Sequence, residues 1–309
     1  MKITKCRSCS SKSIKYISTL GNQYFTGIFP TSKKQKIPKG YLSMVICNKC
    51  SLLQLQNSFD VDVMYGNNYG YLSSLNPHMV RHLKLKSEKL KQISNLSSGD
   101  VVIDIGSNDG TSLKNFEKKY KLIGVDPTIK KLKNLYRKDI IKVPEFFNKD
   151  SIKKYIKNKK AKIITTISMF YDLPNPIKFA QDINESLDDN GIWHLEQSYM
   201  PSMIKNISYD TICHEHYEYY SLTSVKYISG DQFRYGFYLD GEDLDKLEIV
   251  LGSGNWGLRF GTKYSSNSLE ISSGVVESTK LQDWTYSFGY NLNGNDISLS
   301  QSIIDNGDG

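Results

Sequence analysis

Two histidines and a glutamate lie together in one short, tyrosine-rich stretch of the sequence. His214, Glu215 and His216 stand within Asp210-Thr-Ile-Cys-His-Glu-His-Tyr-Glu-Tyr-Tyr-Ser221, and three tyrosines follow them. Histidine titrates near neutral pH, and a neighbouring Glu or Tyr can orient it or stabilise an oxyanion. The cluster therefore predicts a proton-transfer site of the kind that enolisation beside a ketone requires. The alternative is structural, because an aromatic, half-polar segment can also cover the edge of a sheet.

Four of the five cysteines form two Cys-x-x-Cys pairs near the N-terminus. The pairs are Cys6 with Cys9 and Cys47 with Cys50, and 37 residues separate them. Each pair fits a tight turn that directs two thiolates at one metal, and two such turns complete a tetrahedral shell. We therefore predict one structural zinc ion, since a closed shell of four thiolates leaves no position for a reacting water. Redox use of the cysteines and the absence of a metal are the alternatives.

A short apolar run that ends in a glycine turn marks a nucleotide-binding element. Val101–Ile105 leads into Gly106-Ser-Asn-Asp-Gly110, which predicts a buried strand, a tight turn and a helix that begins near Thr111. Glycine at both ends of the turn lets the backbone approach a ligand closely. A second strand, Leu122–Asp126, ends in an acidic residue suited to a ribose diol. The candidate cofactor-binding residues are Asp104, Gly106, Asn108, Asp109, Gly110 and Asp126.

The spacing of these glycines differs from the dinucleotide fingerprint and fits an S-adenosylmethionine site better. Other nucleotide binders and plain turn glycines remain as alternatives. Further elements are expected along the chain: a helix over Pro77–Ile93, and strands over Phe25–Pro30, Tyr41–Val45, Ile140–Val143, Lys162–Ile167 and Gly191–Glu196. Alternating strands and helices after residue 76 predict a doubly wound parallel α/β sheet, with its ligand at the carboxyl ends of the strands.

Charge and glycine content both change near residue 229 of this 309-residue chain, which is long enough for two or three domains. Residues 229–309 hold 5 of the 40 basic and 12 of the 32 acidic side chains, and 12 of the 22 glycines. The net charge is therefore about +15 before this point and about −7 after it. The lysines are dispersed among Asn and Ile, which favours a solvated basic surface, or attraction of a phosphorylated small substrate, over nucleic-acid binding.

The composition also bears on the compartment of the protein. The N-terminus lacks the apolar region of a signal peptide, and no stretch approaches the ~18 apolar residues of a membrane span. Paired cysteines suit a reducing environment better than a disulfide framework. We expect a soluble cytoplasmic protein.

Three segments together resemble the sugar C-methyltransferase family. They are the paired cysteine module, the turn Asp104-Ile-Gly-Ser-Asn-Asp-Gly110, and Tyr209–Ser221 with its Cys-His-Glu-His-Tyr core. The resemblance covers residues 1 to about 228. It implies a Rossmann-like methyltransferase that transfers a methyl group from S-adenosylmethionine to the carbon beside the keto group of a nucleotide-linked 4-keto-deoxysugar, in deoxysugar biosynthesis.

The resemblance also implies roles for single residues. His216 corresponds to the general base, Glu215 to its partner and Tyr71 to an active-site tyrosine. The α-proton must leave before the carbon can attack, and the enolate then needs donors such as a Tyr hydroxyl or a second histidine, for which His214 is the candidate. Tyr171 stands in the segment where some members carry a histidine after the fourth strand, and a cysteine replaces a tyrosine two residues before Glu215.

The end of the chain departs from the family, whose members continue with two more sheet strands and a further α/β domain. We expect residues 1–75 to form the zinc-binding domain, 76–228 a partial methyltransferase core and 229–309 a separate antiparallel β domain that does not restore the missing strands. Impaired activity would follow from an open sheet edge.

Strands in this last domain are expected over Phe237–Leu239, Leu247–Leu251, Trp256–Phe260, Leu269–Ser272 and Trp284–Tyr290.

Two other functions compete with the sugar methyltransferase. A non-catalytic, zinc-stabilised fusion that binds carbohydrate or protein is one. A nucleic-acid methyltransferase is the other, and it is disfavoured because Tyr171-Asp-Leu-Pro174 is not the Asn/Asp-Pro-Pro-aromatic motif of amino-methylating enzymes.

Overall fold

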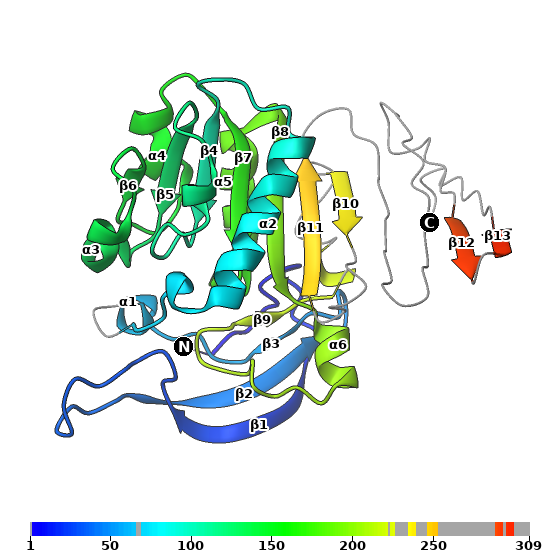
Figure 1. Ribbon diagram of the computed structural model, residues 1–309. Coiled ribbons are helices and arrows are strands. Elements are labelled where there is room, and N and C mark those ends of the chain that lie inside the picture. Colours follow the sequence, from blue (N-terminus) through cyan, green and yellow to red (C-terminus); the bar gives the residue numbers. More distant parts are fainter. Residues whose placement is uncertain are drawn as a thin grey trace.

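The computed structural model describes residues 2–65, 69–221 and 223–225, together with the backbone of four later strands. Those strands are β10 (Arg234–Tyr238), β11 (Lys246–Gly252), β12 (Phe288–Leu292) and β13 (Asn295–Leu299). Two sheets form most of the described structure, and Figure 1 shows the larger one above the smaller.

The larger sheet has seven strands in the order β10-β11-β8-β7-β4-β5-β6. Its other strands are β4 (Val101–Ile105), β5 (Lys121–Val125), β6 (Ile141–Val143), β7 (Ala161–Ile167) and β8 (Leu187–Ser198). These five run parallel, β11 is antiparallel to β8, and β10 is antiparallel to β11. The predicted doubly wound sheet is confirmed, with β8 beginning four residues earlier than expected.

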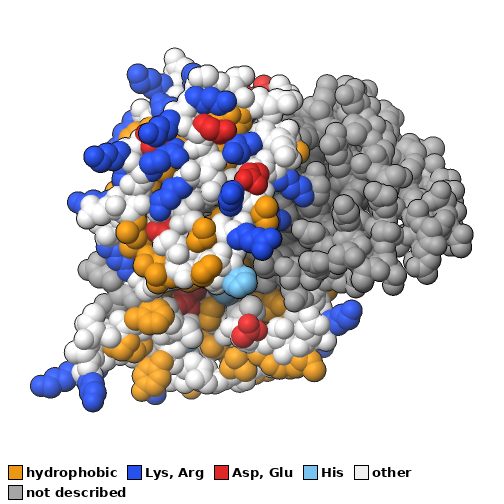
Figure 2. All heavy atoms as spheres, viewed as in Figure 1, with side chains coloured by type: hydrophobic (Ala, Val, Ile, Leu, Met, Phe, Trp, Pro, Cys, Tyr) orange, Lys and Arg blue, Asp and Glu red, His pale blue; other side chains and the backbone are white. Residues whose placement is uncertain are grey.

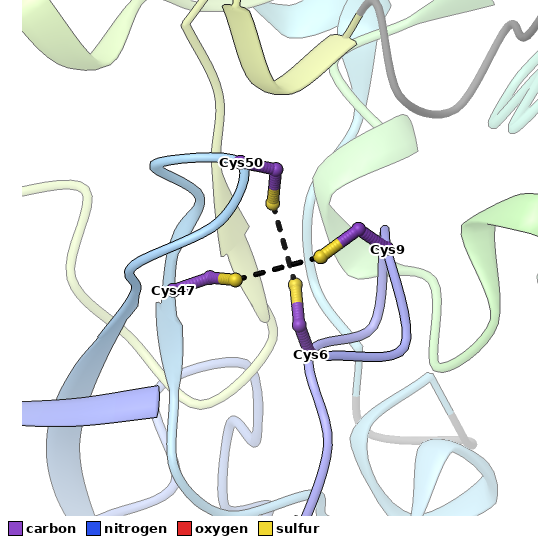
Figure 3. A group of neighbouring side chains, drawn as sticks. All are labelled: Cys6, Cys9, Cys47 and Cys50. Carbon is purple, nitrogen blue, oxygen red and sulfur yellow. Dashed lines mark hydrogen bonds between the residues drawn. The ribbon is translucent and has the colours of Figure 1, made fainter. Parts of the chain in front are cut away.

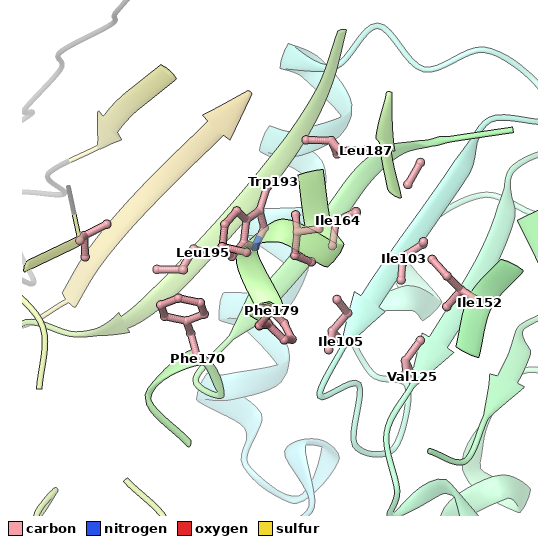
Figure 4. Close-up of a cluster of buried hydrophobic side chains, with 14 of the residues drawn as sticks. Ile103, Ile105, Val125, Ile152, Ile164, Phe170, Phe179, Leu187, Trp193 and Leu195 are labelled. Atoms are coloured by element: carbon pink, nitrogen blue, oxygen red, sulfur yellow. The ribbon is translucent and has the colours of Figure 1, made fainter. Parts of the chain in front are cut away.

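Alternate residues of the strands supply two hydrophobic cores, because neighbouring side chains on a strand point to opposite faces. Ile103 and Ile105 of β4 pack with Phe179 of α5 (Pro176–Ser186) on one face, which Figure 4 shows. Val102 packs on the other face with Leu90 of α2 (Pro77–Ile93). Helices therefore pack on both faces of the sheet. Loops form the edge at the carboxyl ends of the parallel strands, where the ligand is expected.

The helices begin at strong capping residues. The Asn76 side chain accepts from the backbone N–H groups of the first turn of α2, whose first residue is proline. Asn148 caps α4 (Lys149–Ile156) and Asn175 caps α5 in the same way. The shorter helices and 3-10 turns are α1 (Val61–Met64), α3 (Ile129–Leu132), α6 (Met200–Lys205), η1 (Ser73–Leu75), η2 (Leu113–Asn115), η3 (Lys133–Leu135) and η4 (Phe170–Asp172).

The smaller sheet has the order β1-β2-β3-β9 and is antiparallel throughout. Its strands are β1 (Ile14–Tyr24), β2 (Lys39–Cys47), β3 (Leu53–Leu55) and β9 (Glu218–Tyr219). The first three belong to the N-terminal cysteine module, but β9 comes from the histidine segment. Backbone pairing of β9 with β3 therefore joins the candidate catalytic segment to the cysteine module.

Two local predictions are wrong. The segment Phe25–Pro30 forms no strand, because Phe25 and Ile28 instead turn into a core with Met200 and Tyr217. The glycine turn leads not into a helix near Thr111 but into the 3-10 turn η2, since the chain folds at once toward β5. The helix over Pro77–Ile93 and the strand at Tyr41–Val45 are confirmed.

The prediction that residues 229–309 leave the large sheet incomplete is also wrong. Lys246–Gly252 pairs with Ser198–Ile192 of β8 along its whole length, and β10 pairs with the far side of β11. The boundary at residue 229 therefore cuts through the sheet. β12 and β13 do form a separate antiparallel pair. The strands expected over Trp256–Phe260 and Leu269–Ser272 lie outside the described residues.

Two surface observations accompany the fold. Figure 2 shows Lys and Arg side chains scattered over the domain of the large sheet rather than gathered into one patch. Within the described residues, no helix has the length and apolar composition that crossing a membrane requires.

The pairing of β11 with β8 makes a testable prediction. A chain that ends at Ile228 should be less soluble and melt at a lower temperature than the full chain, because it exposes the backbone groups of Ile192–Ser198. A chain that ends at Asn255 keeps β10 and β11 and serves as the control. Soluble yield and thermal unfolding measure the effect, and equal behaviour of the two truncated chains would refute it.

Candidate functional site

The four cysteines of the N-terminal module converge on one point. The sulfur atoms of Cys6 and Cys50 are 3.6 Å apart, those of Cys9 and Cys47 are 3.5 Å apart, and all four lie within 4.8 Å of one another. Figure 3 shows them pointing inward from two turns. A tetrahedral zinc ion with Zn–S bonds of about 2.3 Å needs sulfur atoms about 3.8 Å apart. The cluster fits one four-coordinate zinc ion and leaves no open position for water.

The cysteine site is connected to the histidine segment through Arg7, which lies between two of the cysteines. Its side chain donates to the Leu55 carbonyl at 2.7 Å and to the Ser58 hydroxyl at 2.9 Å, and its guanidinium lies 5.0 Å from the centre of the Tyr217 ring. Its Nε lies 3.6 Å from Oε1 of Glu218 in β9. Both side chains of this ion pair are almost completely buried.

His214 and Glu215 are both held by the cysteine module. His214 is fully buried between the rings of Phe25 and Phe59, at centroid distances of 4.6 and 4.9 Å, and its Nε2 lies 3.1 Å from the Gly40 carbonyl oxygen. Glu215 accepts from the Thr26 hydroxyl at 2.5 Å. These contacts give His214 a packing role and leave the neighbouring histidine as the candidate base.

A Cβ atom on Gly27 would lie 2.1 Å from Oε1 of Glu215, so only glycine admits the carboxylate in this position. Glu215 is therefore seated against the backbone of the cysteine module, and its position depends on that module being folded.

His216 has the geometry of a general base. Its Nδ1 lies 2.8 Å from the carbonyl oxygen of Thr211, so Nδ1 carries the proton and donates it there. The lone pair is then on Nε2, which lies 3.9 Å from Oδ1 of Asp172. Burial lowers the pKa of His216, so the imidazole is neutral at neutral pH.

Tyr171 and Asp172 come from the turn η4 that follows β7. The Tyr171 ring lies against His216 with centroids 4.0 Å apart, and its carbonyl oxygen accepts from the Tyr217 backbone N–H at 2.7 Å. Burial raises the pKa of Tyr171 well above its usual value. The structure therefore brings Tyr171 to the predicted base, as a ring that orients the imidazole.

The glycine turn lies at the carboxyl ends of β4 and β5. Gly106, Asn108 and Gly110 have φ values of +72°, +49° and +75°, which places them in the left-handed region that glycine favours. A Cβ atom on Gly106 would lie 2.9 Å from the Met169 side chain, so the turn packs closely against the segment after β7. This turn matches the expected cofactor loop in position and backbone conformation.

Asp126 organises the turn from the end of β5. One carboxylate oxygen accepts from the Asn108 backbone N–H at 2.9 Å, and the other accepts from Thr128 N–H at 2.7 Å and its hydroxyl at 2.5 Å. Burial raises its pKa. Asp104 accepts from the Thr165 hydroxyl at 2.6 Å, and burial raises its pKa to about 7. Asp126 is thus positioned for a diol, whereas Asp104 braces β4 against β7.

Asn108 and Asp109 hold the segment before α2 over the glycine turn. Asn108 accepts from the Ser73 N–H and donates to the Tyr71 carbonyl, both at 3.0 Å, while Asp109 accepts from the Ser74 N–H at 2.8 Å. Asp109 is fully buried, and these hydrogen bonds lower its pKa against the effect of burial. Both residues therefore shape the wall of the cofactor site.

Tyr69 stands two residues before the predicted Tyr71 and has the more perturbed environment. The Tyr71 side chain is 45% exposed. Burial raises the pKa of Tyr69, and the charges of Asp172 and Asp126 raise it further, so both carboxylates act on this one ring.

Five residues of this arrangement were not predicted from the sequence. Asp172 directly follows Tyr171, and Arg7 stands between two predicted zinc ligands, so their places next to predicted residues were available signals. Tyr65, Tyr69 and Glu218 had no such signal that distinguishes them from the other tyrosines and acidic residues of the chain.

The comparisons with known proteins agree with this organisation. Residues 79–229 match the family described as "Methyltransferase domain", and residues 6–65 match one described as "Putative zinc binding domain". With the seven-stranded sheet and the four-cysteine cluster, these matches define a class I S-adenosylmethionine-dependent methyltransferase domain preceded by a zinc-binding domain.

Two curated relatives are similar in sequence. The "C-methyltransferase NovU" of Streptomyces niveus is 26% identical over 186 residues, which are 60% of this chain and 44% of that protein. The "Carboxy-S-adenosyl-L-methionine synthase" of Nautilia profundicola is 32% identical over 127 residues, 39% of this chain and 53% of that protein. The chain thus spans about half the length of the curated relatives it matches.

Solved structures share the outline of the fold at low identity. The plantazolicin methyltransferase BpumL, in complex with S-adenosylhomocysteine and a substrate analog, superposes with a TM-score of 0.43 and 13% identity over 57% of this chain and 83% of its own. An S-adenosylmethionine-dependent methyltransferase from Clostridium acetobutylicum gives the same TM-score and identity over 57% of this chain and 92% of its own.

Metal analysis tests the zinc site. We expect one zinc ion per chain, and Cys47→Ser together with Cys50→Ser should remove it and lower the thermal stability, because the thiolate shell anchors the small sheet. Cys213→Ser changes the one cysteine outside the cluster and is the matched control. A zinc content unaffected by the double substitution would contradict the assignment.

Proposed function

We propose that the chain is an S-adenosylmethionine-dependent C-methyltransferase that acts beside the keto group of a nucleotide-linked 4-keto-deoxysugar. The observation that carries this proposal is the tautomer of His216. Its Nδ1–H is bound to the Thr211 carbonyl, which leaves a basic Nε2 on a side chain that is 23% exposed. A neutral imidazole that a substrate can reach is suited to removing a weakly acidic proton from carbon.

The cofactor residues support the donor. The turn Gly106–Gly110 lies where class I methyltransferases and other doubly wound proteins bind nucleotides, and Oδ2 of Asp126 keeps one lone pair, whereas Oδ1 accepts from both the N–H and the hydroxyl of Thr128. We place the ribose diol at Asp126. When bound, S-adenosylmethionine supplies an electrophilic methyl group to the carbon that His216 has deprotonated.

The enolate that forms needs stabilising donors. Tyr69 and Tyr65 keep their hydroxyl protons, because burial raises the pKa of both. The Tyr65 hydroxyl is hydrogen-bonded to Asp172, so the Tyr69 hydroxyl is our candidate to donate to the enolate oxygen. Tyr171 orients the base through ring contact, and Glu215 fixes the segment against the cysteine module.

The similarity to the C-methyltransferase NovU supports carbon as the methylated atom, and the sugar substrate follows from the family resemblance of the three sequence segments. The completed sheet favours an active enzyme over a non-catalytic binding fusion, and the dispersed lysines give little support to a nucleic-acid substrate. A reducing compartment suits four metal-binding thiols, and we therefore place the reaction in the cytoplasm.

Cofactor binding tests the assignment of Asp126. Asp126→Asn should weaken S-adenosylmethionine binding by about 10- to 100-fold, or about 1.5–3 kcal/mol, because an amide replaces the charged acceptor of the ribose and of the Asn108 N–H. Calorimetry measures the affinity. Asp189→Asn, at a side chain that is 90% exposed, is the control. Equal affinities for all three proteins would remove Asp126 from the site.

Proton exchange tests His216 separately from methyl transfer. With a nucleotide-linked 4-keto-6-deoxyhexose and no methyl donor, His216→Asn should lower solvent deuterium incorporation at the substrate carbon by about 10²- to 10⁴-fold. The wild-type rate should be flat above pH 6.5 and fall below it, since burial lowers the pKa of His216 from 6.5 and only the neutral form is a base. Full-rate exchange in His216→Asn, with His78→Asn as the exposed control, would assign the base elsewhere.

A further inference from the structure

One carboxylate oxygen of Asp172, Oδ1, lies in an unusual environment for a charged group. Oδ1 is buried and accepts no hydrogen bond from any residue that the structure describes. Nε2 of His216 lies 3.9 Å from it. A buried carboxylate oxygen without a donor is costly, and such a group in a folded protein calls for a functional explanation.

The tautomer of His216 explains why the two groups face each other without a hydrogen bond. Nδ1–H is donated to Thr211, so Nε2 presents a lone pair to Oδ1 of Asp172. Two acceptors cannot bond to each other. Once Nε2 gains a proton, however, the imidazolium is a charged donor. A small movement of either side chain then brings it within hydrogen-bonding distance of Asp172.

We propose that Asp172 receives from His216 the proton that the base has removed from the substrate, and so restores the base for the next turnover. This inference rests on the proposed function of His216. In the first step the substrate C–H bond breaks, the N–H bond at Nε2 forms, and the electron pair stays with the substrate. In the second step the N–H bond breaks, the O–H bond at Oδ1 forms, and His216 is neutral again. Water then takes the proton from Asp172.

The surroundings favour transfer in this direction. Burial lowers the pKa of His216, so its imidazolium releases a proton readily. Burial raises the pKa of Asp172 well above its usual value, so its carboxylate takes a proton readily, although a hydrogen bond with Tyr65 opposes this effect. Both shifts come from burial that is incomplete, since 23% of the His216 side chain and 14% of the Asp172 side chain stay exposed to water.

The other titratable groups around this pair are less suited to the task. They are Tyr171 from η4, Tyr65 and Tyr69 from the segment after β3, and Glu215 and Cys213 from the segment of His216 itself. Glu215 is held by the Thr26 hydroxyl against Gly27, and burial raises the pKa of Cys213 to about 12. The tyrosines keep their protons and cannot accept another.

The test separates proton removal from proton release. The protein is given a nucleotide-linked 4-keto-6-deoxyhexose and S-adenosylmethionine, and the first turnover is compared with the steady state. Asp172→Asn should complete its first turnover within about threefold of the wild-type rate but lose at least about tenfold in the steady state, because the proton stays on His216. Asp172→Glu, which keeps a carboxylate, should recover part of the loss. A merely structural role would slow both phases together, and that result, or no change in either phase, overturns the proposal.

A second measurement needs neither substrate nor methyl donor. The His216 ring resonance, assigned with His216→Asn, should show two titration steps in the wild type, because Asp172 shares its proton equilibrium, and one step in Asp172→Asn. Asp182→Asn, which changes another buried carboxylate that is paired with Lys178 on α5, should keep both steps. A single step in the wild type overturns the inference, whereas two steps without any wild-type methyl transfer would count against the proposed function alone.

Discussion

The buried pair of Arg7 and Glu218 is the interaction on which the two halves of the molecule depend. Arg7 lies between the zinc ligands Cys6 and Cys9, and Glu218 lies two residues after the candidate base. Burial raises the pKa of Glu218 well above its usual value, and only the charge of Arg7 opposes that effect. The pair lies where β9 joins β3, so the position of the histidine segment depends on the fold of the cysteine module.

The histidine segment is thus placed by contacts from outside the methyltransferase sheet. Its backbone extends the small sheet through β9, His214 fills an aromatic pocket of the cysteine module, and Glu215 is seated on Gly27. From the other side, the turn η4 brings Tyr171 and Asp172 to His216. A base held by two separate units can be aligned with a cofactor loop that belongs to only one of them. The zinc-binding domain therefore helps to position the proposed base, although its metal has no open position.

The sequence was sufficient where local pattern determines structure. The metal ligands, the parallel strands and the glycine turn were predictable, because Cys-x-x-Cys spacing, buried apolar runs and left-handed turn positions are each fixed by a few neighbouring residues. The resemblance assigned the base to His216, but the contacts that distinguish it from His214 were not predictable, since the two histidines are two residues apart in the same motif. His214 lies against the Gly40 carbonyl of the cysteine module, whereas Nδ1 of His216 donates to Thr211 in its own segment.

The pairing at the edge of the large sheet is a second feature that the sequence did not predict. Charge and glycine content change near residue 229, and a change in composition describes the surface that a segment presents rather than the strands with which it pairs. β8 carries unpaired N–H and C=O groups along Ile192–Ser198 until another strand binds there, and any strand of suitable length can satisfy them. β11 does so with an antiparallel register over seven residues, and β10 follows it. The backbone requirement of the open edge therefore determined the topology, and the acidic, glycine-rich composition of this segment did not prevent it.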